Sequence, residues 1–218
     1  MKKYQDIKVA VDIVIFAIRD GKLQTLLIQM KKKPFYRFWA FPGGLIKKTE
    51  TLDQAAHREL YEKTGLRNVY LEQLYTFGEL RRDPFGRVVS VAYFALIQEP
   101  KRLKPGAKYL DVRLWPVSKL PHLAYDHTKI SRYALRRLRA KLQYSNVAWS
   151  LLPRAFSLGD LQKVYEIILG RKIDKRNFRK RVKDLELLKY TGKNSQGQHR
   201  PAKLYRFRTI KSVLVEVT

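Results

Sequence analysis

The sequence predicts an α/β fold in two parts, a mixed β-sheet between helices over residues 1–145 and a smaller helix-and-hairpin domain over residues 146–218. Strand-like runs flank one central amphipathic helix in the first part, which is typical of a sheet covered by helices. The pattern then changes after residues 144–155, which have no regular period and predict a linker. An apolar share of 45% is enough for a packed core.

The first part alternates strands with two helices. Strands are expected at residues 8–18, 23–29, 69–78, 87–97 and 112–115, and helices at residues 51–64 and 128–143. Asp20-Gly21 between the first two strand-like runs is typical of a β-hairpin turn. Gly65 is a suitable residue to end the first helix. Strands on either side of a helix, with another helix behind, predict an α/β/α sandwich.

The second part combines two helices with a hairpin. Ser157 and Asp160 form a capping-box pattern before a helix that Gly170 ends. After a turn of about four residues, Asp174 can cap a second helix with an apolar stripe. Residues 188–208 then predict a strand, a polar turn and a strand, which completes a winged helix-turn-helix arrangement.

The formal net charge of +27 is the strongest signal in the composition. It exceeds what solubility requires and predicts a polyanionic partner, for which nucleic acid is preferred and an acidic membrane surface is the alternative. Residues 146–218 hold 17 basic and 6 acidic residues, and residues 1–145 hold 29 and 13. Charge alone therefore does not locate the binding surface.

The composition also excludes several kinds of site. Without cysteine, the chain has no disulfide, thiolate nucleophile or zinc–thiolate site, which suits a reducing cytoplasm. No apolar stretch follows the basic N-terminus, so no signal peptide is expected. No apolar run reaches the roughly 18 residues of a membrane span. We expect a cytoplasmic protein with no membrane partner.

Residues 44–66 carry a long motif. Its members are Gly44, Glu50, Arg58, Glu59, Leu60, Glu62, Gly65 and Leu66, preceded by Phe41-Pro42-Gly43. This spacing resembles the Nudix box, and the resemblance implies a Nudix fold for residues 1–145. Carboxylates three and four residues apart share a helical face and suit Mg²⁺ or Mn²⁺, so Glu59 and Glu62 are the metal candidates. Arg58 is expected to pair with Glu50.

Lys63 departs from this motif, because Nudix hydrolases carry a metal-binding glutamate at its position. A cation here favours a pair with Glu59 at i, i+4, or a contact with a ligand phosphate. We therefore assign no catalytic residue, although Glu50, Arg58, Glu59 and Glu62 are retained. No cofactor is expected to be required, and any Mg²⁺ is expected to bind weakly. An active hydrolase of the ADP-ribose pyrophosphatase type is the alternative.

Further segments, Arg81–Leu96 and Ala124–His127, resemble the sensor domain of Nudix-related transcriptional regulators, the NrtR-like proteins. The resemblance implies an effector such as ADP-ribose or a related nucleoside diphosphate sugar of NAD metabolism, with a sugar such as arabinose as the alternative. The predicted ligand-binding residues are Gly43, Gly44, Lys63, Arg82 and Arg87. A solvated hairpin tip is the alternative for the two arginines. His127 is expected to be structural.

Basic residues concentrate around the second helix of residues 146–218. The predicted DNA-binding residues are Lys175, Arg176, Asn177, Arg179, Lys180 and Lys183 on the helix, and Lys193, His199 and Arg200 on the hairpin. The helix would bury Phe178, Val182 and Leu185 and turn its cations toward a groove. Asp174–Val182 and His199–Phe207 again resemble the same regulators. A basic surface helix of generic role, including RNA binding, is the alternative.

The resemblance covers nearly the whole chain. It implies a transcriptional regulator whose affinity for an operator responds to an effector in the Nudix cleft. Such regulators bind palindromic double-stranded DNA as homodimers, because the two-fold symmetry of the protein matches that of the site. The helix at 128–143 and the sensor sheet are the candidate dimer seams.

Overall fold

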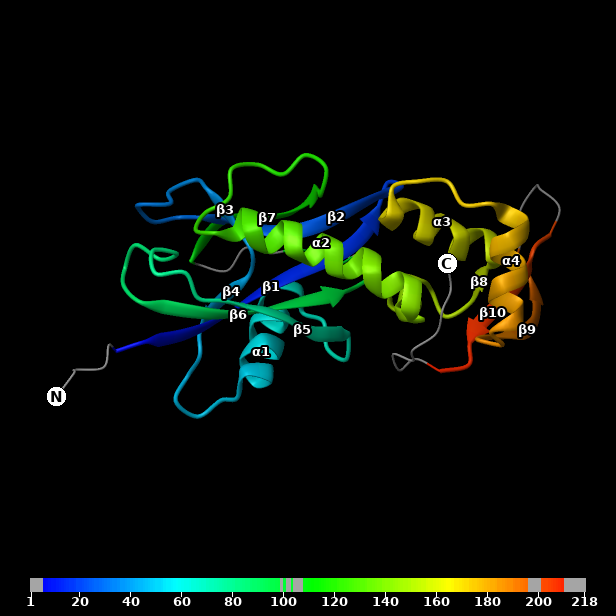
Figure 1. The fold of residues 1–218 in the computed structure, drawn as a ribbon, viewed down its shortest axis with the longest axis horizontal. Coiled ribbons are helices and arrows are strands. Elements are labelled where there is room, and N and C mark those ends of the chain that lie inside the picture. Colours follow the sequence, from blue (N-terminus) through cyan, green and yellow to red (C-terminus); the bar gives the residue numbers. More distant parts are fainter. Residues whose placement is uncertain (1–5, 99, 101–102, 104–107, 196–200, 210–218) are drawn as a thin grey trace. The chain divides into compact units, whose positions relative to one another are not determined.

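The computed structural model describes residues 6–98, 100, 103, 108–195 and 201–209 (Figure 1). The chain forms two compact units, one with residues 1–19 and 23–134 and the other with residues 20–22 and 135–218. Helix α2 (His127–Tyr144) therefore begins in the first unit and ends in the second. The boundary expected after residue 145 stays a prediction.

The first unit is built on a mixed sheet of seven strands. They are β1 (Lys8–Arg19), β2 (Lys22–Met30), β3 (Trp39–Ala40), β4 (Gly43–Leu45), β5 (Tyr70–Phe77), β6 (Val88–Leu96) and β7 (Tyr109–Pro116). The order is β3-β2-β1-β6-β5, with β4 paired to β1 and β7 paired to β2. Strand β1 runs parallel to β6, whereas β5 runs antiparallel to β6 and β7 antiparallel to β2. The predicted mixed sheet is present.

Both faces of strand β1 are covered. The side chains of Val11 and Ile13 belong to the core cluster that includes Ala56 and Leu60 of helix α1 (Leu52–Thr64). Asp12, between them, instead lies beside His127 at the start of α2. Successive side chains of a strand point to opposite faces, so α1 and α2 cover opposite faces of the sheet. A nearly continuous buried run is typical of a strand covered in this way.

The hairpin turn after β1 and the end of helix α1 form as predicted, and the structure adds a cap at the start of α1. Asp20 and Gly21 join β1 to β2 with φ of 51° and 67°, the positive values that a tight hairpin turn requires. Thr51 and Gln54 form a reciprocal capping box at the start of α1. Gly65 ends α1 with φ of 69°.

The second unit combines two helices with a three-stranded sheet. The elements are helices α3 (Leu158–Leu169) and α4 (Lys175–Asp184), and strands β8 (Phe156–Ser157), β9 (Leu188–Asn194) and β10 (Lys203–Phe207) in the order β8-β10-β9. Ser157 and Asp160 form the predicted capping box of α3, and Asp174 caps α4. Phe178 of α4 packs against Tyr165 of α3 with ring centroids 5.2 Å apart.

The prediction of an unstructured linker over the whole of residues 144–155 was wrong. Residues Val147–Leu151 form a short 3₁₀ helix, η1, and the side chains of Val147 and Ala148 are fully buried. The apolar residues of this segment follow neither a helical nor a strand period, so no element is predicted for it from the sequence. A single 3₁₀ turn has a period of three, and it buries these side chains without a longer repeat.

None of the helices in the described ranges has the length and apolar character needed to cross a bilayer.

The capping box of α3 provides a test of the second unit. Replacing Ser157 with alanine should lower the free energy of unfolding by about 1 kcal/mol, because the amide of Asp160 loses its acceptor. Urea unfolding followed by circular dichroism measures the change. Ser157→Thr keeps the hydroxyl and should recover most of the loss. Equal loss in both variants would argue against the cap.

Candidate functional site

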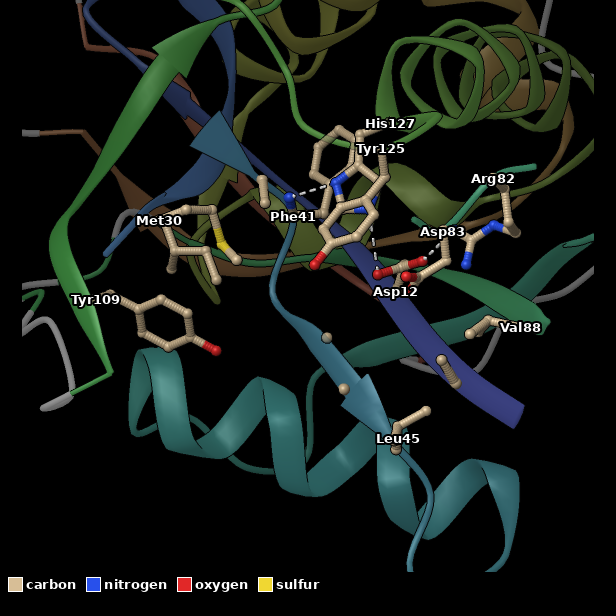
Figure 2. Close-up of a pocket in the computed structure, with 15 residues that line it drawn as sticks. Asp12, Met30, Phe41, Leu45, Arg82, Asp83, Val88, Tyr109, Tyr125 and His127 are labelled. Atoms are coloured by element: carbon tan, nitrogen blue, oxygen red, sulfur yellow. Dashed lines mark hydrogen bonds and ion pairs between the residues drawn. The ribbon is translucent and has the colours of Figure 1, made fainter. Parts of the chain in front are cut away.

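A cavity of about 160 Å³ opens between β1, β4 and the segment that leads into α2. Met30 and Tyr109 lie at one end of it, and Arg82, Asp83 and Val88 lie at the other (Figure 2). The cavity therefore has an apolar, aromatic end and a charged end. Such a combination suits a ligand that joins a flat ring to polar groups.

Asp12 is the centre of a hydrogen-bond network at the charged end. One carboxylate oxygen, Oδ2, accepts from Ser90 Oγ at 2.6 Å and from Arg82 Nη2 at 3.1 Å. The other, Oδ1, lies 3.4 Å from His127 Nε2. Arg82 also donates to both carboxylate oxygens of Asp126, at 2.8 and 3.0 Å. The network joins β1, β6, the loop before β6 and the start of α2.

His127 connects this network to the loop before β4. Its Nδ1 accepts the backbone amide of Phe41 at 2.9 Å, and the two rings are stacked with centroids 5.4 Å apart. Because Nδ1 is an acceptor, the ring proton lies on Nε2, facing Asp12. The prediction of a structural role for His127 agrees with this geometry.

The surroundings of Asp12 lower its pKa. Burial would raise the pKa, but His127, Arg82 and Ser90 lower it to about 2, from an ordinary value of 3.8. Burial likewise disfavours the charged form of Arg82, yet its hydrogen bonds to Asp126 and the charges of both aspartates raise its pKa. Both groups are therefore charged at neutral pH.

Gly43 and Gly44 are glycines because β4 lies close to its neighbours. A Cβ at Gly43 would lie 2.3 Å from the carbonyl oxygen of Val11, and a Cβ at Gly44 would lie 2.7 Å from Oε1 of Glu59. Both distances are too short for any larger residue without movement of the backbone or of Glu59. Both glycines line the cavity, where a ligand can approach the backbone closely.

The carboxylates of the Nudix-box motif are paired with cations of the chain. Arg58 donates to both oxygens of Glu50, at 2.7 and 3.0 Å, which is the pair expected from the sequence. It also donates to Oε1 of Glu59 at 2.6 Å. Hydrogen bonding to Arg58 lowers the pKa of Glu50 to about 2.

Lys63 supplies a second cation to the same group. Its ammonium lies 3.9 Å from Oε2 of Glu59 and 3.7 Å from Oε2 of Glu62, and 4.7 Å from the ring centroid of Tyr109. The side chain is buried, with 7% of its surface exposed. The predicted pair between Lys63 and Glu59 is therefore present.

The residues at this place do not fit a divalent ion. Both oxygens of Glu59 have a cationic group of the chain nearby, so a metal would have to displace Arg58 or Lys63. Within the described residues, no three or more histidine, aspartate or glutamate side chains are grouped so that they could hold a metal ion. A Mg²⁺ site usually needs several oxygen ligands in octahedral geometry.

The structure separates the five residues predicted to bind the ligand. Gly43, Gly44 and Arg82 line the cavity, whereas Arg87 and Lys63 are not among its lining residues. Arg82 is buried, so the alternative of a solvated hairpin tip is wrong for it. Arg87 donates to the carbonyl oxygens of Gly78 and Glu79 and so ties down its own loop. A role of either arginine in binding phosphate stays a prediction.

Three residues that line the cavity, Asp12, Tyr109 and Tyr125, have no role among the sequence-based predictions. Asp12 carried a signal, because it is the one charged residue within the apolar run of residues 9–18. Tyr125 lies in the segment Ala124–His127, which was noted for its resemblance but given no role of its own, and Tyr109 carried no signal that distinguishes a cavity wall from a core position. Tyr125 adopts a positive φ of 54° and its ring lies 4.3 Å from that of Phe35. A non-glycine residue in that region is often found at a functional site.

Helix α4 exposes the side chains of most residues predicted to bind DNA. Lys175, Arg176, Asn177, Lys180 and Lys183 are exposed, and Phe178 and Val182 are buried on the opposite side. A groove next to α4 is lined by residues that include Asn177, Lys180 and Arg181. This is the arrangement of a recognition helix, with one apolar side docked and one polar side available.

Arg179 differs from that expectation. It is half-buried, and its Nε has no hydrogen-bond partner in the described structure. Its position one residue after Phe178 turns it toward the flank of the helix rather than toward the exposed side. Leu185 follows the last turn of α4 and is half-buried. Lys193 is exposed on β9, whereas His199 and Arg200 lie outside the described residues.

Two families match the chain, one for each part. Residues 8–138 match the NUDIX domain family, and residues 148–207 match the family described as NrtR DNA-binding winged helix domain. The chain is 40% identical over 202 residues to the ADPR responsive transcriptional repressor NtrR of Acinetobacter baylyi, covering 90% of this chain and 80% of that protein. It is 37% identical over 128 residues to the ADP-ribose pyrophosphatase of Methanocaldococcus jannaschii, covering 59% of this chain and 73% of that enzyme.

Solved structures of Shewanella oneidensis NrtR are also similar. The structure complexed with a 27mer DNA has a TM-score of 0.81 and 38% identity, and covers 92% of this chain and 93% of that one. The NUDIX domain of the same protein complexed with ADP ribose has a TM-score of 0.57 and 37% identity, and covers 62% and 90%. The similarity thus extends over both parts of the chain.

The network around Asp12 predicts a pH-dependent stability. Because the folded-state pKa of Asp12 lies below its ordinary value, the carboxylate stabilises the fold above about pH 4, and this contribution is lost as the pH falls toward 2. Asp12→Asn should lower the free energy of urea unfolding by about 3 kcal/mol at pH 7, because a buried pair is broken. The difference from wild type should shrink as the pH falls.

Glu79→Gln is the matched control, since it removes an exposed ion pair with Lys129. It should cost at most about 1 kcal/mol. A constant difference between Asp12→Asn and wild type from pH 7 to pH 2.5 would contradict the assignment.

Proposed function

Because the chain belongs to the NrtR family of Nudix-related transcriptional regulators, we propose that it is a repressor that binds operator DNA and responds to ADP-ribose. One observation carries the proposal. The carboxylates of its Nudix motif pair with Arg58 and Lys63, and the same chain continues into a basic winged-helix domain. The motif therefore forms part of an effector-binding site, and effector binding changes the affinity of the protein for operator DNA.

The effector binds in the cavity next to β4. The full-length relative from Acinetobacter baylyi is named for its response to ADP-ribose, and the similar NUDIX domain from Shewanella oneidensis was crystallised with ADP ribose. ADP-ribose has an adenine ring and two ribose groups with hydroxyls. The aromatic end at Tyr109 suits the ring, and the carboxylate of Asp83 at the charged end suits sugar hydroxyls as an acceptor (Figure 2). These contacts favour ADP-ribose over arabinose.

Binding of the effector needs no metal in this proposal. In hydrolases of this fold a divalent ion neutralises the diphosphate and activates water. Here Arg58 and Lys63 supply positive charge at the same carboxylates, next to Gly44. They offset the charge of these carboxylates, which would otherwise repel a diphosphate, but they cannot polarise a water molecule as a metal does. The expected outcome is retention of the ligand without its cleavage.

DNA binding depends on the exposed side of α4. Arg176 and Asn177 lie near the amino end of this helix, from which recognition helices read base edges, and Lys180 and Lys183 suit phosphates. We place the protein in the cytoplasm as a homodimer on palindromic DNA. Effector binding needs to change the affinity for DNA by only about 1–3 kcal/mol to act as a switch.

Selection from a pool of random 30-base-pair duplexes tests the proposal as a whole. The full-length protein should enrich a palindromic sequence, and ADP-ribose should weaken binding to that duplex by at least tenfold, without added metal. ADP, which lacks the terminal ribose, is the control ligand and should have a smaller effect. The absence of any enriched sequence would overturn DNA recognition. An equal response to both ligands would overturn the assignment of the effector.

The cationic side of α4 gives a second prediction. Arg176→Ala combined with Lys180→Ala should weaken binding to the selected duplex by at least tenfold, because a base contact and a phosphate contact are lost. ADP-ribose binding, measured by calorimetry, should be unchanged. Arg154→Ala with Lys163→Ala removes the same charge from other exposed positions of the second unit and should change affinity less than threefold. An equal loss of DNA affinity in the two double variants would contradict the assignment of α4 as the recognition helix.

Lys63 gives a third prediction. Lys63→Glu places three carboxylates together, so without metal the protein should unfold at a lower temperature. Mg²⁺ should reverse that loss and stabilise the variant by about 2.7 kcal/mol at a hundred times its dissociation constant. Cleavage of ADP-ribose should then become measurable.

Lys63→Gln removes the cation without adding a ligand and should show no metal response. Wild-type turnover of ADP-ribose with Mg²⁺ at about 1 s⁻¹ or more would be ordinary for an enzyme and would contradict the proposal.

A further inference from the structure

Helix α2 has an unusual charge composition. Its 18 residues include Lys129, Arg132, Arg136, Arg137, Arg139 and Lys141, and no aspartate or glutamate. Neither the cavity nor the recognition helix uses these side chains. They also account for part of the charge excess of residues 1–145, which the DNA-binding unit does not explain.

Four of these cations lie on one exposed side of α2. Lys129, Arg132, Arg136 and Arg139 are all exposed, and their spacing of three, four and three residues places them along one stripe of a helix. The stripe is about 15 Å long, at about 1.5 Å per residue. We refer to these four residues as the α2 basic face. The opposite side, with Ile130, Ala134, Leu138 and Leu142, is fully buried.

The α2 basic face works against the stability of its own helix. Arg132 and Arg136 are like charges at i, i+4, and Arg136 and Arg139 are like charges at i, i+3. Glu79, from the loop before β6, pairs with Lys129 at 2.6 Å in a solvent-exposed position. Within the described residues, Arg139 is held by a hydrogen bond from its Nε to the carbonyl oxygen of Ile168. A row of phosphates lying along this face would reduce the repulsion between these like charges.

We propose that the α2 basic face binds the phosphate backbone of duplex DNA, as a contact surface separate from helix α4. The inference rests on the proposed function, because it assumes that duplex DNA is the partner of the protein. The face has one lysine and three arginines, and the planar guanidinium groups of Arg132 and Arg136 can each match two phosphate oxygens. Phosphate contacts of this kind are independent of base sequence.

The chemistry of the face favours DNA over a membrane. A helix that lies on a bilayer inserts an exposed apolar side below its charges. The apolar side of α2 is taken up by the protein core, and Ile130 and Leu138 have no exposed surface. A bilayer would therefore meet only the charged heads of the helix. A rigid row of phosphates is the better match.

The salt dependence of DNA binding tests this proposal. The dissociation constant of the full-length protein for a 30-base-pair duplex of random sequence is measured from 50 to 300 mM NaCl, and its logarithm is plotted against that of the salt concentration. Arg132→Gln with Arg136→Gln should reduce the slope by about 1.8, since each phosphate contact contributes about 0.9. Arg132→Lys with Arg136→Lys keeps both charges and should retain the wild-type slope.

Lys48→Gln with Lys119→Gln is the matched control. It removes two positive charges from exposed positions of the first unit that are not part of α2, and it should leave the slope unchanged. Glutamine is a good helix former, so the α2 variant should melt at no lower a temperature than wild type. A wild-type slope in the α2 variant, or an equal reduction in the control, overturns the inference.

The outcomes separate this inference from the proposed function. If wild-type protein does not bind duplex DNA, the proposed function fails. If the double variant of Arg176 and Lys180 loses affinity while the α2 variant keeps its slope, only the α2 basic face fails. Loss of binding to phosphatidylserine vesicles or to single-stranded RNA by the α2 variant, with the duplex slope unchanged, also overturns it, because the face would then serve a different polyanion.

Discussion

The buried carboxylate of Asp12 is the constraint around which the first unit is arranged. A buried carboxylate in a central strand needs a countercharge and hydrogen-bond donors, and Arg82 supplies the charge while Ser90 and His127 add polar contacts from two other segments. Each partner is thereby fixed in position. His127 in turn holds the amide of Phe41, which sets the entry to β4 and its two glycines. The shape of the cavity thus follows from the need to satisfy one aspartate.

The same logic explains how a fold suited to phosphate hydrolysis becomes suited to recognition. The carboxylates that remain in the Nudix motif would repel one another and any diphosphate unless a cation lay between them. In this chain Arg58 and Lys63 are covalently attached cations, so the charge balance does not depend on a free ion. A tethered ammonium lacks the open coordination positions through which a metal activates water. The site can therefore bind a diphosphate ligand without favouring its hydrolysis.

Helix α2 has an unusual place in this arrangement. Its first residue contacts both Asp12 and Phe41, and its last residues belong to the unit that contains α3 and α4. One side of the helix is fully buried, while the other carries four exposed cations. Positive charge is therefore distributed over both units. The recognition helix alone does not account for a net charge of +27.

The longer strands and helices could be predicted from the sequence, because their patterns and caps depend on neighbours in the chain. Asp20-Gly21, Ser157 with Asp160, and the apolar stripes of α3 and α4 have local causes, and each was predictable. The pair of Arg58 with Glu50 was also predictable, since a known motif fixes their relative position. The pairing of Asp12 with Arg82 could not be predicted, because these two residues are 70 positions apart in the chain and meet only in the folded protein. The half-burial of Arg179 and the burial of Val147 and Ala148 in η1 likewise appear only in the tertiary structure. Burial and long-range pairing depend on how elements meet in space, which no local pattern records.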